Sequence, residues 1–161
     1  NPEIVIEVLT PDFLDDDAAI DTVLAARPEI FNHNLETIRR LTPEVRSVAT
    51  YERSLSVLTK AKEHSPKIFT KSGLMLGLGE TEPELLEALA DLRATGCDLL
   101  TLGQYLQPTK KHLPVVEFIH PDQFAEHKIT AESMGFIHVA SGPLVRSSYH
   151  ADDFAMERFT S

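Results

Sequence analysis

Short apolar runs alternate along the chain with longer segments whose apolar positions recur at helical spacing. The apolar runs are rich in Val, Ile and Leu and predict strands; they span residues 4–9, 29–34, 72–77, 98–106 and 136–140. The segments between them predict helices, at residues 15–26, 51–64, 81–96 and 121–134. This alternation is typical of right-handed βαβ units in a parallel sheet. We therefore expect an α/β fold, an open or partial barrel of parallel strands with flanking helices, in one domain spanning residues 1–161.

Polar residues gather directly after the predicted strands, although the strand bodies are very apolar. In parallel βα folds, functional residues collect at the C-terminal ends of the strands. The polar groups that follow the first four strands are Pro11-Asp12, residues 32–36, residues 77–80 and residues 104–108. A barrel without a site has no need of such polar ends, so we expect a site at this edge of the sheet.

Two amides and a carboxylate occupy alternate positions at the end of the second strand, at Asn32, Asn34 and Glu36. Alternate positions of an extended chain point to one side. Such a set can bind a ribose diol, with Glu36 accepting from the hydroxyls. The start of a helix, with Asn34 as its N-cap, explains the same residues equally well.

Two further segments carry candidate chemistry. Glycines within residues 73–80 permit a close approach of backbone to a nucleotide, but a tight turn into the next helix explains them more simply. Residues 146–150 combine an arginine, two serines, a tyrosine and a histidine after Gly142-Pro143. They can bind an anion or a metal, or form a solvated tail.

Composition excludes several classes of function. The chain carries 25 acidic and 15 basic residues, a net charge of -10. We therefore expect no nucleic-acid partner and no membrane partner, since an acidic surface repels both. The one cysteine, Cys97, cannot form a disulfide within the chain or a thiolate metal site, and we expect it to be buried and structural. The seven histidines show no zinc-binding spacing.

Four segments together resemble lipoyl synthases, radical-SAM enzymes that insert sulfur. They are residues 31–37, 70–81, 102–108 and 142–151, within a similarity that runs from about Ile4 to Asp152. Biotin synthases share the Asn-His-Asn-Leu segment and the glycine strand, whereas the Arg-Ser-Ser-Tyr tail is specific to lipoyl synthases. The resemblance implies the C-terminal part of a partial (β/α)6 radical-SAM barrel.

The resemblance also implies an activity, the insertion of two sulfur atoms at C6 and C8 of a protein-bound octanoyl group. It implies S-adenosylmethionine (SAM) and two [4Fe–4S] clusters as cofactors. It implies an octanoylated lipoyl domain or glycine-cleavage H protein as the partner. It further implies a bacterial-type cytoplasmic location, with a mitochondrial or plastid one left open. The residues implied to bind SAM are Asn32, Asn34, Glu36, Gly77, Glu80, Gln104 and Tyr105, and the implied cluster ligand is Ser148, with Ser147 as its alternative.

The chain departs from the lipoyl synthase pattern in two places. All six cluster cysteines of the family are missing, and residues 45–49 read Val-Arg-Ser-Val-Ala where the family has Val-Arg-Pro-Gly-Ala. We therefore expect a C-terminal portion of the enzyme that is inactive alone. Two alternatives stay open: a non-catalytic half-barrel module that binds SAM or a partner, and another radical-SAM sulfur-inserting enzyme near biotin synthase.

Overall fold

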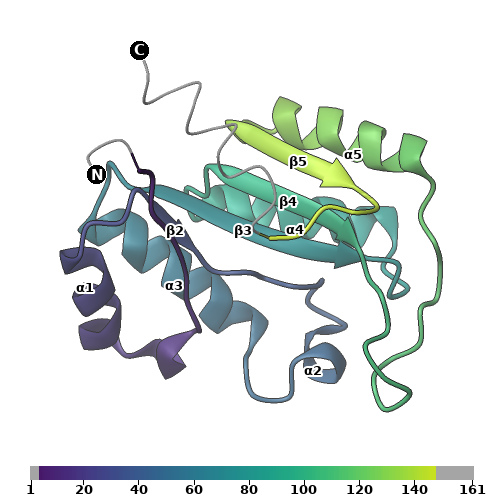
Figure 1. Cartoon of the computed structure of the whole chain (residues 1–161), viewed down its shortest axis with the longest axis horizontal. Helices are drawn as coiled ribbons and strands as arrows, with labels where there is room; N and C mark the ends of the chain where they lie inside the picture. The colour runs from purple at the N-terminus through teal and green to yellow at the C-terminus, as the bar shows by residue number, and fades with distance from the viewer. Residues whose placement is uncertain (1–3, 148–161) are drawn as a thin grey trace.

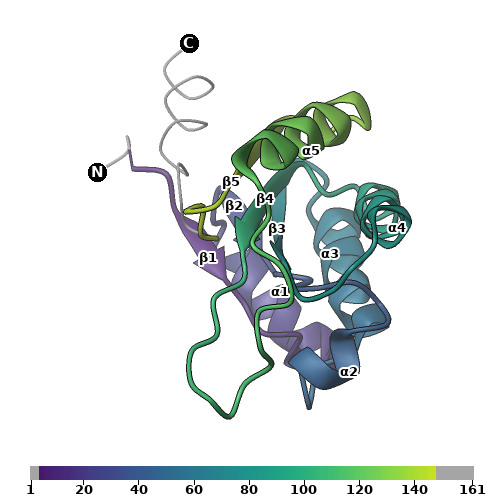
Figure 2. The same cartoon turned by 90° about the vertical axis from the view of Figure 1, so that its right-hand side faces the viewer.

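The computed structural model describes residues 4–147, and five parallel strands form one sheet in chain order. The strands are β1 (Glu7–Leu9), β2 (Ile30–Asn32), β3 (Phe69–Leu76), β4 (Leu99–Gln104) and β5 (His138–Gly142). Because all five are parallel, their C-terminal ends lie at one edge of the sheet (Figure 1). The expected α/β fold is confirmed, and the curved sheet with its helices on one side has the form of a partial barrel (Figure 2).

Helices fill the connections between strands. They are the 3-10 turn η1 (Phe13–Asp15), α1 (Asp17–Ala25), α2 (Thr42–Val45), α3 (Tyr51–His64), α4 (Glu82–Ala94) and α5 (Pro121–Ser133). Helix α3 begins where the hydroxyl of Thr50 accepts from the amide of Arg53 at 3.1 Å. Helix α4 begins with a capping box between Thr81 and Glu84.

The helix-covered face of the sheet holds the main hydrophobic core. Alternate residues of β3 and β4 point into it and meet leucines of α4 and α3. These buried residues include Leu58, Leu74, Leu76, Leu85, Leu89, Leu92, Leu100 and Leu102. Each leucine side chain buried in this way contributes about 1.5–3 kcal/mol, so the core fixes the sheet on which the site is built.

The opposite, inner face of the sheet is layered from apolar to polar. Ile30 and Leu99 are buried at its N-terminal end, with Phe69 packed against them. Polar side chains of Glu7, Asn32 and Lys71 bond to one another across β1, β2 and β3, and nearer the C-terminal edge Gly73 and Thr101 are small. This change of character marks the C-terminal edge as the place for a ligand.

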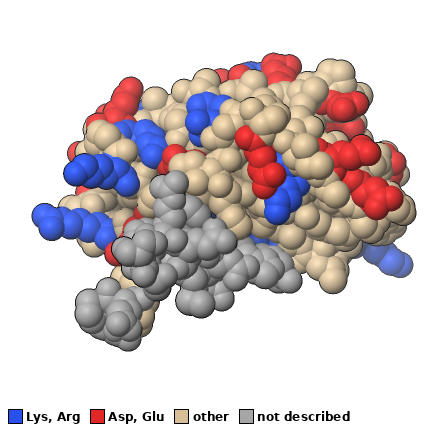
Figure 3. All heavy atoms as spheres, turned by 90° about the horizontal axis from the view of Figure 1, so that it is seen from above, with Lys and Arg blue, Asp and Glu red and all other residues tan. Residues whose placement is uncertain are grey.

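The structure differs from the expected elements mainly at their ends. Strand β1 pairs only from Glu7, β4 ends at Gln104, and β5 continues to Gly142 as a full parallel partner of β4. Helix α2 was not expected. Within residues 4–147 no helix has the length and apolar character that crossing a bilayer requires. Acidic side chains gather on the right-hand part of the face that Figure 3 shows.

Candidate functional site

A cavity of about 350 Å³ lies at the C-terminal edge of the sheet, on its inner face. Its volume falls within the range of about 300–1,000 Å³ that is typical of small-molecule sites. Every strand of the sheet, or the segment that follows it, contributes to its wall. The lining residues are Leu9, Asn34, Glu36, Gly73, Leu74, Met75, Thr101, Gly103, Gln104, Leu106, Val145, Arg146 and Ser147.

The chain after β2 stays extended and runs beside β3. The amide of Glu36 donates to the carbonyl of Gly73 at 2.9 Å, and the amide of Met75 donates to the carbonyl of Glu36 at 2.8 Å. Asn34 and Glu36 therefore share the cavity side, as the alternation predicted. No helix begins at Asn34, since the next one in the described chain starts at Thr42, so the N-cap interpretation is wrong.

The backbone of Glu36 adopts a left-handed conformation with φ of 72°. For a residue other than glycine this conformation costs about 1–3 kcal/mol, and it is concentrated at functional sites. Two hydrogen bonds to β3 hold it in place. The strain is consistent with a carboxyl group placed for binding.

Asn34 and Glu36 present acceptors to the cavity. The side-chain oxygen of Asn34 is buried and has no partner among the described residues. Burial raises the pKa of the Glu36 carboxyl, against a hydrogen bond from Asn34 and the charge of Arg46. A ligand with hydroxyl or amino hydrogens would satisfy both groups.

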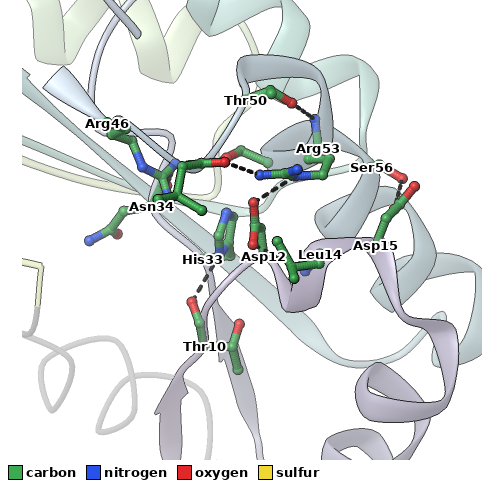
Figure 4. Close-up of polar contacts among 12 residues, drawn as sticks. Thr10, Asp12, Leu14, Asp15, His33, Asn34, Arg46, Thr50, Arg53 and Ser56 are labelled. Carbon is green, nitrogen blue, oxygen red and sulfur yellow. Dashed lines mark hydrogen bonds and ion pairs between the residues drawn. The ribbon is translucent and has the colours of Figure 1, made fainter. Parts of the chain in front are cut away.

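Arg46 braces this acceptor pair from the side. Its guanidinium Nη1 donates to the backbone oxygen of Asn34 at 3.2 Å and to the hydroxyl of Ser54 on α3 at 2.8 Å. Figure 4 shows Arg46 beside Asn34 at the end of β2. The brace joins the site to the helix layer and fixes the position of Asn34.

Two glycines let neighbouring segments approach the sheet closely at the cavity wall. A β-carbon at Gly73 would lie 2.5 Å from the hydroxyl of Thr101 and 3.1 Å from the side-chain oxygen of Asn34. A β-carbon at Gly103 would lie 2.3 Å from the carbonyl of Val145. The segment after β5 can therefore cross β4 and bring Arg146 to the cavity only because position 103 is glycine.

The structure brings only some of the predicted site residues together. Asn34, Glu36 and Gln104 line the cavity. Asn32 lies one layer below it and donates to the carboxylate of Glu7 at 2.7 Å. Ser148, the implied cluster ligand, lies outside the described residues, although its neighbour Ser147 lines the cavity.

Gly77, Glu80 and Tyr105 are not among the lining residues. The carboxylate of Glu80 accepts from the amides of Gly77 and Leu78 at 2.5 and 2.9 Å, which closes the turn after β3. The phenol of Tyr105 donates to the carbonyl of Leu113 at 2.9 Å. The cofactor-binding role of each of these residues stays a prediction.

Sequence reasoning did not single out Thr101 or Gly103 as wall residues. The alternation of β4 offered a signal, because Thr101 and Gly103 lie two apart and are smaller than Leu100 and Leu102, which alternate with them. Met75 lies within the candidate segment of residues 73–80, and its spacing of two from Gly73 places both on the same face of β3. Alternation alone, however, does not say which face of a strand meets a ligand.

A second cluster of polar residues lies between the ends of β1 and β2 and helix α3. His33 is buried, and its Nδ1 lies 2.9 Å from the carbonyl of Thr10 (Figure 4). Asp12 pairs with Arg53 of α3 at 2.8 Å. Burial opposes ionisation of Asp12, but hydrogen bonds from Leu14 and Arg53 outweigh it and lower its pKa. These contacts fasten the ends of β1 and β2 to α3.

Residues 4–147 contain no group of three or more His, Cys, Asp or Glu side chains arranged to hold a metal ion. Cys97 is fully buried, and burial raises the pKa of its thiol to about 12. A protonated, enclosed thiol is a poor metal ligand. The expectation that Cys97 is structural agrees with this position.

Comparison with known proteins identifies the family of the chain. The family model of the radical SAM superfamily matches residues 1–92 of the 161. A lipoyl synthase of Halalkalibacterium halodurans is 60% identical over 153 residues, which cover 95% of this chain and 50% of that protein. A lipoyl synthase of Geobacillus kaustophilus is 58% identical over 157 residues, covering 98% of this chain and 53% of that protein.

A third relative, the lipoyl synthase of Shouchella clausii, is 58% identical over 153 residues and covers 95% of this chain. The chain spans about half the length of these curated relatives. The family model, in contrast, accounts for more than half of the chain itself. The chain belongs to the radical SAM superfamily.

Proposed function

We propose that the chain is part of a lipoyl synthase, which inserts two sulfur atoms at C6 and C8 of a protein-bound octanoyl group. The observation that carries the proposal is the acceptor pair of Asn34 and Glu36, which faces a cavity at the C-terminal edge of a radical-SAM sheet. Identity of about 60% to proteins named lipoyl synthase supports this choice of activity.

The cavity fits the nucleoside part of SAM. The ribose hydroxyls would donate to the Glu36 carboxylate and to the buried oxygen of Asn34, which otherwise lacks a donor among the described residues. Gly73, which has no side chain, lets the buried oxygen of Asn34 approach β3 at the cavity wall. When bound, SAM supplies the radical that removes hydrogen from the substrate. Arg46, through its contact with Asn34, would hold the acceptors in place.

The described residues do not fit an iron–sulfur cluster. The single cysteine is buried, and residues 4–147 hold no other set of metal ligands. We propose that the cluster cysteines belong to the part of the relatives' length that this chain does not span. Ser148 is the one residue of this chain that we propose as a cluster ligand.

The cavity wall also suits an alkyl substrate. Leu9 and Leu106 are half exposed or more at its rim, and Met75 lies deeper on β3. Their apolar surfaces would pack along an octanoyl chain. We propose that an octanoylated lipoyl domain or glycine-cleavage H protein delivers the octanoyl group to the cavity.

The test uses the complete protein with reconstituted clusters, SAM and an octanoylated H protein, with mass spectrometry of the product. We expect a lipoyl product from the wild type. Glu36→Gln should weaken SAM binding about tenfold or more, because a hydrogen bond to a charged group contributes about 1.5–3 kcal/mol. Glu126→Gln, on the exposed surface of α5, is the matched control and should bind SAM normally.

Three results would contradict the proposal. Unchanged SAM affinity in Glu36→Gln would remove the assigned role of the cavity. Sulfur insertion into dethiobiotin, without a lipoyl product, would place the protein near biotin synthase. Tight SAM binding with neither product would favour a non-catalytic module.

A further inference from the structure

A long connection between β4 and α5 projects from the same edge of the sheet that holds the cavity (Figures 1 and 2). It spans residues 105–120 and has neither helix nor strand. We refer to it as the β4–α5 loop. Loops placed in this way over a rigid scaffold commonly carry function.

The base of the β4–α5 loop is firmly held. The side-chain oxygen of Gln104 accepts from the amide of Ile119 at 2.9 Å, and its nitrogen donates to the carbonyl of Glu117 at 3.0 Å. The carbonyl of Gly77 accepts from the amides of Val116 and Glu117 at 2.9 and 3.2 Å. A β-carbon at Gly77 would lie 2.3 Å from the carbonyl of Glu117, so glycine permits this contact.

The tip of the loop is a compact turn with a positive charge. Thr109 and His112 contact each other through side chains at 2.9 Å, and Gln107 donates to the carbonyl of His112 at 2.7 Å. Lys110 and Lys111 are both exposed on this turn. Among the ion pairs of the described residues, neither lysine takes part.

These lysines stand out because the chain as a whole carries a net charge of -10. Most other lysines and arginines of the described chain are in ion pairs or donate to neighbouring backbone. Two unpaired cations on this turn attract an acidic surface, whereas the net negative charge of the chain repels one.

Apolar residues accompany the charged tip. Phe118 is 73% exposed and Val116 is 65% exposed on the returning arm of the loop. Leu106, on the outgoing arm, lines the cavity. Exposed aromatic and aliphatic side chains beside charges are typical of protein-binding surfaces. The loop is thus continuous with the site at its first residues.

We propose that the β4–α5 loop docks the carrier protein of the octanoyl chain through an acidic patch on that carrier. Lys110 and Lys111 attract the patch, and Phe118 supplies an apolar contact. Leu106 then lies where the octanoyl chain of the carrier enters the cavity. The inference rests on the proposed function, because it names the surface by which that substrate is recognised.

The test compares two substrates on the complete enzyme carrying Lys110→Glu and Lys111→Glu. One substrate is an octanoylated H protein of acidic surface, and the other is a short uncharged peptide with an octanoylated lysine. We expect KM for the carrier to rise about tenfold or more, with little change for the peptide. Raising the salt concentration should reduce the difference between wild type and variant.

The matched control is Lys67→Glu combined with Arg27→Glu. Lys67 is exposed, and both residues line a separate pocket near the opposite end of the strands. The control has the same change in charge and should leave KM for both substrates unchanged. Phe118→Ala provides a second variant without a charge change and should also raise KM for the carrier alone.

Three outcomes would overturn the inference: equal losses with carrier and peptide, no change with either, or the same loss in the control. If the wild type makes no lipoyl product at all, the proposed function fails. Docking is then judged by calorimetric binding of the acidic carrier to the complete protein. Equal affinity in wild type and charge-reversed variant would refute it.

Discussion

The ammonium of Lys71 on β3 lies 2.8 Å from the carboxylate of Glu7 on β1, across the intervening strand β2. The two side chains are only 5% and 13% exposed. Asn32 of β2 donates to the same carboxylate, so a polar network joins three neighbouring strands. It lies one layer below Asn34 and Gly73 and therefore supports the floor of the cavity.

We expect that removing one partner of the Lys71–Glu7 pair destabilises the fold more than replacing both partners with apolar residues. Lys71→Met should lower the free energy of unfolding by about 3–5 kcal/mol, because it leaves the Glu7 carboxylate buried without its cation. Adding Glu7→Leu should recover much of that loss. Urea unfolding of the variants measures both effects.

The control for the Lys71 variant is Lys128→Met, which removes a surface ion pair with Glu132. Its effect should stay below about 1 kcal/mol. A loss of that size for Lys71→Met, or a double variant as unstable as the sum of the single ones, would show that the buried pair does not hold the strands together.

Glu36 should show a conflict between stability and binding. Burial raises the pKa of its carboxyl above the ordinary 4.5, so folding disfavours the ionised form. The stability that this group contributes is present at low pH and is lost as the pH rises through the raised pKa. At neutral pH, Glu36→Gln should therefore raise the melting temperature.

The same substitution should weaken SAM binding, because the neutral amide is a poorer acceptor for the ribose hydroxyls. Differential scanning fluorimetry with and without SAM measures both quantities in one experiment. If the melting temperature of Glu36→Gln falls while SAM affinity is unchanged, Glu36 serves the fold rather than the ligand.

The fold could be predicted in large part because strand and helix patterns are local. The apolar runs and the helical spacing of apolar positions identify elements whose existence the structure confirms. Helix α2 was missed because four residues, Thr42–Val45, are too short for a periodic signal. The strained turn at η1 was missed because Leu14 and Asp15 have positive φ without being glycine.

The candidate site could be predicted only where it depends on alternation. Asn34 and Glu36 share a face because they lie two apart in an extended segment. Gly77 and Gln104 could not be interpreted from their neighbours alone. Their contacts are with Glu117, far along the chain, and depend on how the β4–α5 loop returns to the sheet.

His33 should make stability depend on pH in the opposite sense to Glu36. Burial, foremost, and the charge of Arg46 lower its pKa below the ordinary 6.5, so the unfolded chain binds a proton more readily than the folded one. Stability from this group is present above about pH 6.5 and is lost as the pH falls below that value. Thermal unfolding between about pH 5 and 8 measures the slope.

A His33→Gln variant should flatten this slope, because glutamine keeps a donor for the carbonyl of Thr10 but does not titrate. His127 on α5, whose side chain is only partly buried, provides the control, as His127→Gln should leave the slope unchanged. An identical pH dependence in wild type and His33→Gln would show that His33 does not ionise differently in the folded and unfolded states.

Cys97 should be inert in the native protein. Its thiol is fully buried, lies 3.4 Å from the carbonyl of Leu99, and has a pKa raised to about 12 by burial. Because the thiolate is the nucleophile, alkylation by iodoacetamide at about pH 8 should be very slow until the chain unfolds. Peptide mapping by mass spectrometry distinguishes Cys97 from any other cysteine of the complete protein. Labelling of the Cys97 peptide at the same rate in native buffer and in urea would mean that the core around β4 opens far more readily than its packing indicates.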